Sequence, residues 1–173
     1  MNKVMILGKP GSGKSTLSRR LASVTQLPLH SLDTIEFKNN GDRIEQALYH
    51  EIHKSMLAEE RWIIEGFGLM TSFYQRLDAA DTLIYIELPY LVSYWWVTKR
   101  FLKGIFIHPK GWPRGCSVLK GTWRSYQVLR LCPRFWDRNL MRKIEQLSTL
   151  KSVYIIRSAT ELDRFIDDHC LFL

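Results

Sequence analysis

The sequence predicts an α/β fold of three layers, in which helices cover both faces of a central five-stranded parallel sheet. Short apolar segments alternate with segments of helical periodicity along the chain, which is the pattern of strand–helix–strand units. Residues 8–15 carry a glycine-rich motif of the kind that joins a strand to a helix. The length of 173 residues favours a single domain spanning residues 1–173, which can bury enough surface to fold without a metal or a disulfide.

The first predicted strand, at residues 4–7, runs directly into the segment GKPGSGKST, which matches G-x-x-x-x-G-K-S/T. Its glycines let backbone N–H groups approach an anion, and the helix predicted at 14–24 directs its positive end to the same place. An ordinary glycine turn would not need the Lys-Ser pair at the helix start. The residues predicted to bind nucleotide here are Gly8, Lys9, Pro10, Gly11, Ser12, Gly13, Lys14, Ser15 and Thr16.

Two side chains of this motif have predicted chemical roles. Lys14 is expected to stabilise charge on the β- and γ-phosphates of ATP, as a catalytic residue. The Ser15 hydroxyl is expected to bind Mg²⁺. ATP and Mg²⁺ are therefore the predicted cofactors.

A second strand at 27–32 is predicted to end at Asp33, and a helix is expected between Asp42 and Glu60. Asp33 has two interpretations that the sequence leaves open. It can contact a phosphoryl acceptor and accept a proton from it. It can equally be a helix N-cap, with Glu36 at the capping-box position.

A third strand, at 61–66, ends in Glu65 and Gly66. A carboxylate at the carboxyl end of a parallel strand beside a phosphate loop is placed to hold Mg²⁺ through water. Glu87 has the same appearance at the end of the fourth strand, at 82–87. Glu65 is preferred because Gly66 gives a ligand close access, and a solvated strand end is the alternative.

The next segment is expected to supply positive charge. Pro89 opens a helix to about Lys103, and residues 104–121, rich in glycine, are predicted to form a flexible lid. Arg100 and Arg114 are the predicted lid arginines, with Arg100 also catalytic because a closing lid brings charge to the transferring phosphoryl group. A solvated basic loop is the alternative.

Two further arginines are assigned by position. Arg76, in a short helical segment, is expected to hold the anion of the acceptor or to pair with Asp78 or Asp81. Arg157 follows the fifth strand, at 152–156, where it is expected to pack against the nucleotide base. A helical region at 123–147 and a closing helix at 160–168 complete the chain.

The aromatic and basic residues in the second half of the chain have either a structural interpretation or a role in binding. The tryptophans expected to pack in the core and lid, rather than to stack on bases, are Trp95, Trp96, Trp112, Trp123 and Trp136. The formal net charge of +8 is concentrated between Lys99 and Lys143. This fits either a nucleotide-facing region of an enzyme or a chain that binds nucleic acid or a membrane surface.

Three widely spaced cysteines without a C-x-x-C pair favour a reducing, cytoplasmic setting and argue against a zinc site. The absence of a signal peptide or a sufficiently long apolar stretch predicts no membrane partner. A monomer or weak dimer is expected.

The segments GKPGSGKST, LPLHSLD, RWIIEGF and RLDAADTLIYIELP, the basic lid and a final IIRS-x-x-E-x-x-x-F together resemble the bacterial DNA topology modulation proteins of the FlaR type. These are small adenylate-kinase-like P-loop NTPases, and the resemblance covers nearly the whole chain. It implies a nucleoside-monophosphate-kinase-like fold with the phosphate-loop strand at the centre of the sheet. By position, Glu65-Gly66 matches the Asp-Gly of related kinases and Arg100 matches a lid arginine.

Two departures from that family are visible. The acid at position 65 is Glu rather than Asp, and the residues after Gly66 lack the arginine with which adenylate kinases bind AMP. The leading hypothesis is an ATP-dependent phosphotransferase acting on a nucleotide or another small acceptor. The alternative is an ATP-binding regulator that binds nucleic acid through its basic half, with little turnover.

Overall fold

The computed structural model describes residues 1–36, 42–106 and 118–170 of the chain. The strands are β1 (Lys3–Gly8), β2 (Leu29–Ser31), β3 (Trp62–Glu65), β4 (Thr82–Ile86) and β5 (Ser152–Ile156). The α-helices are α1 (Lys14–Thr25), α2 (Leu32–Glu36), α3 (Gln46–Ala58), α4 (Met70–Ala79), α5 (Tyr90–Phe106), α6 (Val118–Leu131), α7 (Arg138–Gln146) and α8 (Ala159–Cys170). Short 3-10 helices lie at Cys132–Arg134 and Leu147–Thr149.

The five strands form one parallel sheet in the order β2-β3-β1-β4-β5, which places the strand of the phosphate loop at its centre. Every residue of β3 and β4, and every residue of β1 except Lys3, is buried, because helices cover both faces of the sheet. This explains why these strands read as continuous apolar runs rather than as alternating patterns. The predicted fold class is confirmed.

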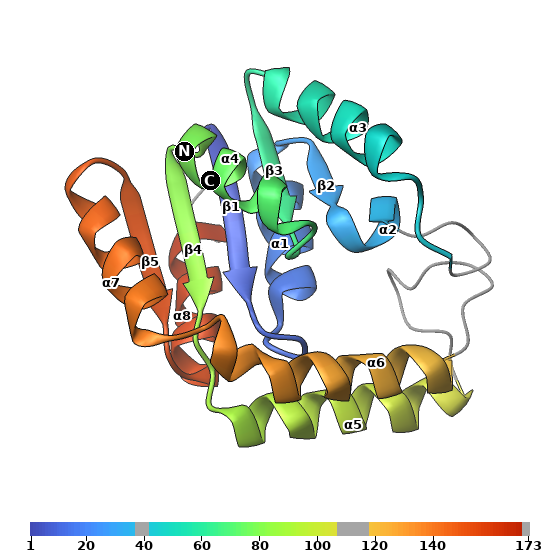
Figure 1. Cartoon of the computed structure of the whole chain (residues 1–173). Coiled ribbons are helices and arrows are strands. Elements are labelled where there is room, and N and C mark those ends of the chain that lie inside the picture. The colour runs from blue at the N-terminus through green and yellow to red at the C-terminus, as the bar shows by residue number, and fades with distance from the viewer. Residues whose placement is uncertain (37–41, 107–117, 171–173) are drawn as a thin grey trace.

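Two separate cores account for the three layers (Figure 1). On one face, α1 and α8 pack against the sheet through Leu17, Leu21 and Phe165. On the other face, α3, α4 and α7 pack through side chains that include Phe73 and Ile144. Helices α5 and α6 lie side by side beyond the carboxyl ends of β1 and β4 in Figure 1.

Several predicted boundaries differ from the structure. Asp33 does not end a strand: it lies in the first turn of α2, and α3 begins at Gln46 rather than at Asp42. The helical region predicted at 123–147 is divided into α6 and α7 at Pro133, which lies in a 3-10 helix.

The predicted lid, residues 104–121, lies partly within helices. Its first three residues belong to α5 and its last four to α6. Residues 107–117, and Arg114 with them, lie outside the described part of the chain. None of the helices in the described ranges is both long and apolar enough to cross a bilayer.

Candidate active site

The phosphate loop curls between β1 and α1 and packs tightly against α5. Gly11 has a φ of +71°, and a Cβ built on it would lie 2.5 Å from the backbone carbonyl oxygen of Ser93. A residue with a side chain would therefore push the loop away from α5. The Ser12 amide donates a hydrogen bond to the Lys9 carbonyl at 3.2 Å, and α1 begins directly after Gly13.

The same Lys9 carbonyl accepts a hydrogen bond from the Lys14 ammonium, at 2.8 Å. Lys14 thus folds back over the loop that precedes its own helix. Burial lowers the pKa of Lys14, while the negative charges of Glu65 and Asp33 oppose that change. The ammonium of Lys9 itself lies 4.5 Å from the centre of the Tyr90 ring.

Glu65 is the buried acid of the site, with 2% of its surface exposed. The hydroxyls of Ser15 and Ser31 both donate to its Oε1, at 3.1 and 2.7 Å. The register of the sheet explains this, because Ser31 on β2 lies opposite Glu65 on β3. Within the described residues, Oε2 has no hydrogen-bond partner. Burial raises the pKa of Glu65, and the charge of Lys14 acts in the opposite direction.

Asp33 and Arg100 approach the same cluster from α2 and α5. The Nη2 of Arg100 donates to the Ser125 hydroxyl of α6 at 3.0 Å. Burial lowers the pKa of Arg100 and the charge of Asp33 counteracts this, so the two side chains interact electrostatically. Gly66 allows α2 to come close, because a Cβ at this position would lie 3.2 Å from Leu32 Cβ. Lys14, Glu65, Asp33 and Arg100 are therefore brought together from four elements.

Arg76 lies inside the protein and is fully buried. Its guanidinium donates to the Ser72 hydroxyl at 2.8 Å and to the Phe67 carbonyl, and it contacts His53 Nε2 at 3.3 Å. These partners differ from the acceptor anion, Asp78 or Asp81 that the sequence suggested. The structure therefore places Arg76 beneath the loop that follows Glu65, not on a surface that an acceptor can reach.

Arg157 follows β5 and is held by acidic side chains. Its amide donates to Glu161 at 2.7 Å, and its Nε lies 3.3 Å from Glu87. Glu87, the competing metal carboxylate, is thus engaged with Arg157 instead of facing Ser15. Both residues lie at the carboxyl ends of their strands, at the same edge of the sheet as the phosphate loop.

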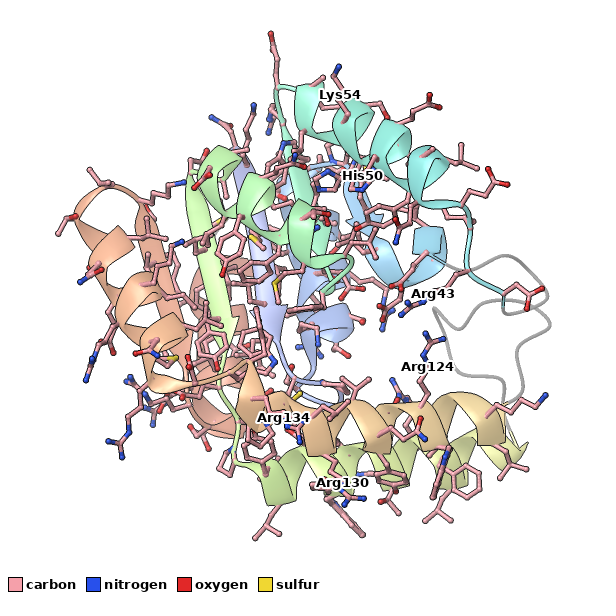
Figure 2. The ribbon with its side chains drawn as sticks, in the orientation of Figure 1. Arg43, His50, Lys54, Arg124, Arg130 and Arg134 are labelled. Atoms are coloured by element: carbon pink, nitrogen blue, oxygen red, sulfur yellow. The ribbon has the colours of Figure 1, made fainter. Side chains whose placement is uncertain are left out.

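Three charged residues near Asp33 were missed as members of the site. The Glu36 carboxylate, almost fully buried, lies 3.0 Å from the Arg43 guanidinium. Burial raises the pKa of Glu36, and the charges of Arg43 and Arg124 oppose that change. Figure 2 shows Arg124 of α6 pointing toward Arg43, whereas Arg130 of the same helix points away. Helical phase, which separates positions 124 and 130, was the signal that could have distinguished these two arginines.

No family model matches the chain. Part of it is similar to curated shikimate kinases. It is 31% identical over 99 residues to that of Rhodococcus jostii, a match that covers 50% of this chain and 59% of the relative. It is 33% identical over 85 residues to that of Flavobacterium johnsoniae, covering 43% and 49%. The chain thus spans about half the length of the curated relatives it matches.

Solved structures with the same fold cover nearly all of the chain. A protein from Chloroflexus aurantiacus described as a kinase has a TM-score of 0.53 at 17% identity, with 100% of both chains covered. A sugar kinase from Janibacter has a TM-score of 0.50 at 14% identity, covering 98% of this chain and 92% of that chain. A gluconokinase from Sinorhizobium meliloti has a TM-score of 0.50 at 13% identity, covering 98% and 90%. The chain therefore has the α/β fold of the P-loop kinases.

Proposed function

We propose that this protein transfers the γ-phosphoryl group of ATP to a small acceptor in an Mg²⁺-dependent reaction. The observation that carries the proposal is the contact between Ser15 and Glu65, which places a hydroxyl and a buried carboxylate beside Lys14. A turn that only joined a strand to a helix would need none of these three side chains. The partial similarity to shikimate kinases supports phosphoryl transfer over the nucleic-acid-binding regulator. The finer FlaR-type resemblance stays a prediction.

The oxygen atoms at this contact suit Mg²⁺, which prefers hydroxyl, carboxylate and water ligands. Ser15 Oγ would bind the ion directly and Glu65 would hold it through water, using the Oε2 that has no partner among the described residues. The bound ion would neutralise charge on the phosphates of ATP. Glu65 must be ionised for this, and the neighbouring charge of Lys14 favours that form.

Lys14 and Arg100 would stabilise the charge that develops on the transferring group. A hydrogen bond orients each of them: Lys14 donates to the Lys9 carbonyl, and Arg100 donates to the Ser125 hydroxyl. Asp33, which interacts electrostatically with both, would orient the acceptor hydroxyl and accept its proton. Arg157 would lie at the nucleotide base, as its position after β5 suggests.

The arginines around Glu36 point to an anionic acceptor. Arg43 and Arg124 converge from the segment before α3 and from α6 (Figure 2), close to Asp33. An acceptor with a hydroxyl and a carboxylate or phosphate would match this arrangement, because arginine binds both anions in a bidentate manner. A nucleotide is one such acceptor.

The test is release of ADP from Mg·ATP in the presence of hydroxy acids, sugar acids and nucleoside monophosphates, each paired with a neutral analogue. We expect one anionic compound to stimulate turnover and its neutral analogue to fail. Lys14→Ala should lower the rate by about a hundredfold or more. Lys54→Ala, which changes an exposed lysine of α3, should not. Wild-type turnover in Lys14→Ala would overturn the proposal.

A further inference from the structure

The positive charge of this protein is concentrated in one stretch of the chain. No Asp or Glu occurs between Glu87 and Asp137, a stretch that includes helices α5 and α6. It contains nine basic residues, against a formal net charge of +8 for the whole chain. These are Lys99, Arg100, Lys103, Lys110, Arg114, Lys120, Arg124, Arg130 and Arg134. The active site described above includes Arg100 and Arg124. Of the other seven, Lys110 and Arg114, the latter a predicted lid arginine, lie outside the described residues, and the remaining five are not part of that site.

The outer surface of the α5–α6 pair is also apolar. Leu91 and Trp95 of α5 are 83% and 60% exposed, and Leu102 follows on the same side of the helix. On α6, Trp123 and Leu119 are each 67% exposed. The prediction that the tryptophans pack in the core and lid therefore does not fit Trp95 and Trp123, which are mostly exposed, and Trp112 lies outside the described residues. Exposed apolar side chains that gather on one surface mark an interaction site.

The two helices form one continuous surface because they are joined along their length. The Tyr94 and Tyr126 rings stack with centroids 5.8 Å apart, and the Thr98 and Tyr126 hydroxyls lie 2.6 Å apart. A shallow groove of about 300 Å³ runs over this junction. Its lining consists of Tyr94, Trp123, Tyr126, Gln127 and Arg130. Arg130 points away from the active site in Figure 2, so this surface and the active site lie on opposite sides of α6.

We propose that the outer surface of α5 and α6 binds the face of an anionic lipid bilayer. Tryptophan favours the headgroup level of a membrane, leucine the acyl boundary, and lysine and arginine the negative surface potential. Lys99, Lys103 and Lys120 are exposed on these helices beside the apolar residues. No membrane-spanning segment is required, because the helices would lie on the bilayer. The sequence alone predicted no membrane partner, although the net charge of +8 left a membrane surface open as one interpretation.

The aliphatic residues favour lipid over the other polyanion that this charge suggests. Aromatic side chains bind nucleic acid by stacking on bases, and basic side chains bind its phosphates. Leucine makes neither interaction. Leu91, Leu102 and Leu119 would stay in water against a nucleic acid and would leave water against a bilayer. A second copy of the chain would bring two basic surfaces together, which like-charge repulsion disfavours.

The experiment is co-sedimentation of the full chain with vesicles of phosphatidylcholine, alone or mixed with phosphatidylglycerol. We expect binding to the mixed vesicles only, and less of it as salt is raised. The double variant Leu91→Ser with Trp95→Ser should bind at least about tenfold more weakly. Leu150→Ser, at an exposed leucine outside these helices, is the matched control and should bind like the wild type.

The charge is tested separately. Lys99→Gln should weaken vesicle binding about fivefold, whereas Lys54→Gln on α3 should not. Turnover of ATP should persist in all of these variants and shows that they fold. Absence of binding to mixed vesicles, or equal loss in the controls, would overturn the proposal. So would binding of a single-stranded oligonucleotide without vesicle binding, or a dimer that the Leu91 and Trp95 changes dissociate.

Discussion

The Arg76 guanidinium donates a hydrogen bond to the Phe67 carbonyl, and so helix α4 holds the loop that follows Glu65. Burial lowers the pKa of Arg76 to about 10, with the Tyr49 hydroxyl acting in the opposite direction. Within the described residues, none of the hydrogen-bond partners of this guanidinium is a carboxylate. The positive charge of Arg76 is instead stabilised by polar but uncharged hydroxyl, imidazole and carbonyl groups. These hydrogen bonds hold the loop after Glu65 in position.

Replacing Arg76 by Met should destabilise the protein and impair the site. The Phe67 carbonyl and the Ser72 hydroxyl would lose a charged donor, which costs about 2 kcal/mol or more of the free energy of unfolding. Glu65 would be held less firmly, so kcat should fall more than the KM for ATP changes. Urea unfolding and initial rates measure these effects. Arg61→Met, at an exposed arginine beside β3, is the control, and equal effects of the two changes would contradict the assignment.

His53 should make the protein lose stability on mild acidification. Burial, reinforced by the charge of Arg76, lowers the pKa of His53 to about 4. In the unfolded chain His53 becomes protonated near pH 6.5, whereas in the folded protein it stays neutral until about pH 4. The free energy of unfolding therefore falls as the pH drops from 6.5 to 4. The loss should be on the order of 2 kcal/mol.

Urea unfolding at pH 7 and pH 5 measures this loss. His53→Gln should remove most of the difference between the two conditions. His50→Gln on the same helix should change it only slightly, because the charge of His50 is the smallest of the three causes that lower the pKa of His53. If both variants keep the full pH dependence, another group is responsible.

Changing Glu65 to Gln should raise stability and lower activity. Burial raises the pKa of Glu65, so its ionised form weakens folding above the unfolded pKa, and that penalty grows as the pH rises through the folded pKa. Gln carries no charge and keeps an acceptor for Ser15 and Ser31. The variant should therefore gain stability relative to the wild type between pH 5 and pH 8.

The same variant should require at least about tenfold more Mg²⁺ for half-maximal turnover, because an amide is a poorer ligand than a carboxylate. Rates measured across an Mg²⁺ titration decide this. Glu60→Gln, at an exposed acid of the same region, is the control. An unchanged Mg²⁺ requirement in Glu65→Gln would remove Glu65 from the metal site.

Arg124→Gln should raise the KM for the acceptor while leaving the KM for ATP nearly unchanged. Loss of one arginine–anion contact corresponds to about tenfold in affinity. Arg130→Gln on the opposite side of α6 provides a matched change of charge and should leave both constants at wild-type values. Steady-state kinetics with the stimulating acceptor measure them, and an equal rise in both variants would indicate a general effect of charge.

The central part of this site was predictable because it is local in sequence. The phosphate loop, the strands on either side of it and the position of Glu65 follow from one motif and from apolar runs of strand length. Asp33 was placed in the right neighbourhood but on the wrong element. Its backbone is helical because α2 begins directly at the end of β2, so Asp33 lies inside the first turn and neither ends the strand nor precedes the helix as its N-cap.

The remaining residues depend on packing between distant elements. Nothing local distinguishes a buried Arg76 from one that faces an acceptor, since the difference lies in His53 of α3 and in the Phe67 carbonyl. Glu36 and Arg43 approach Arg124 only because α6 lies alongside α5, on the far side of the site. Exposure of Trp95 and Trp123 was missed because aromatic periodicity does not reveal which side of a helix is covered.

The place of β1 at the centre of the sheet has a consequence for synthesis. Its register pairs Lys3 with Trp62 on one side and Val4 with Thr82 on the other. A growing polypeptide therefore carries an unpaired apolar strand until both partners have left the ribosome, and pairing between such distant residues is slow. During that interval the strand is a target for chaperones. A chain arrested before residue 82 would contain every residue of the phosphate loop and yet would not hold the loop in its final shape.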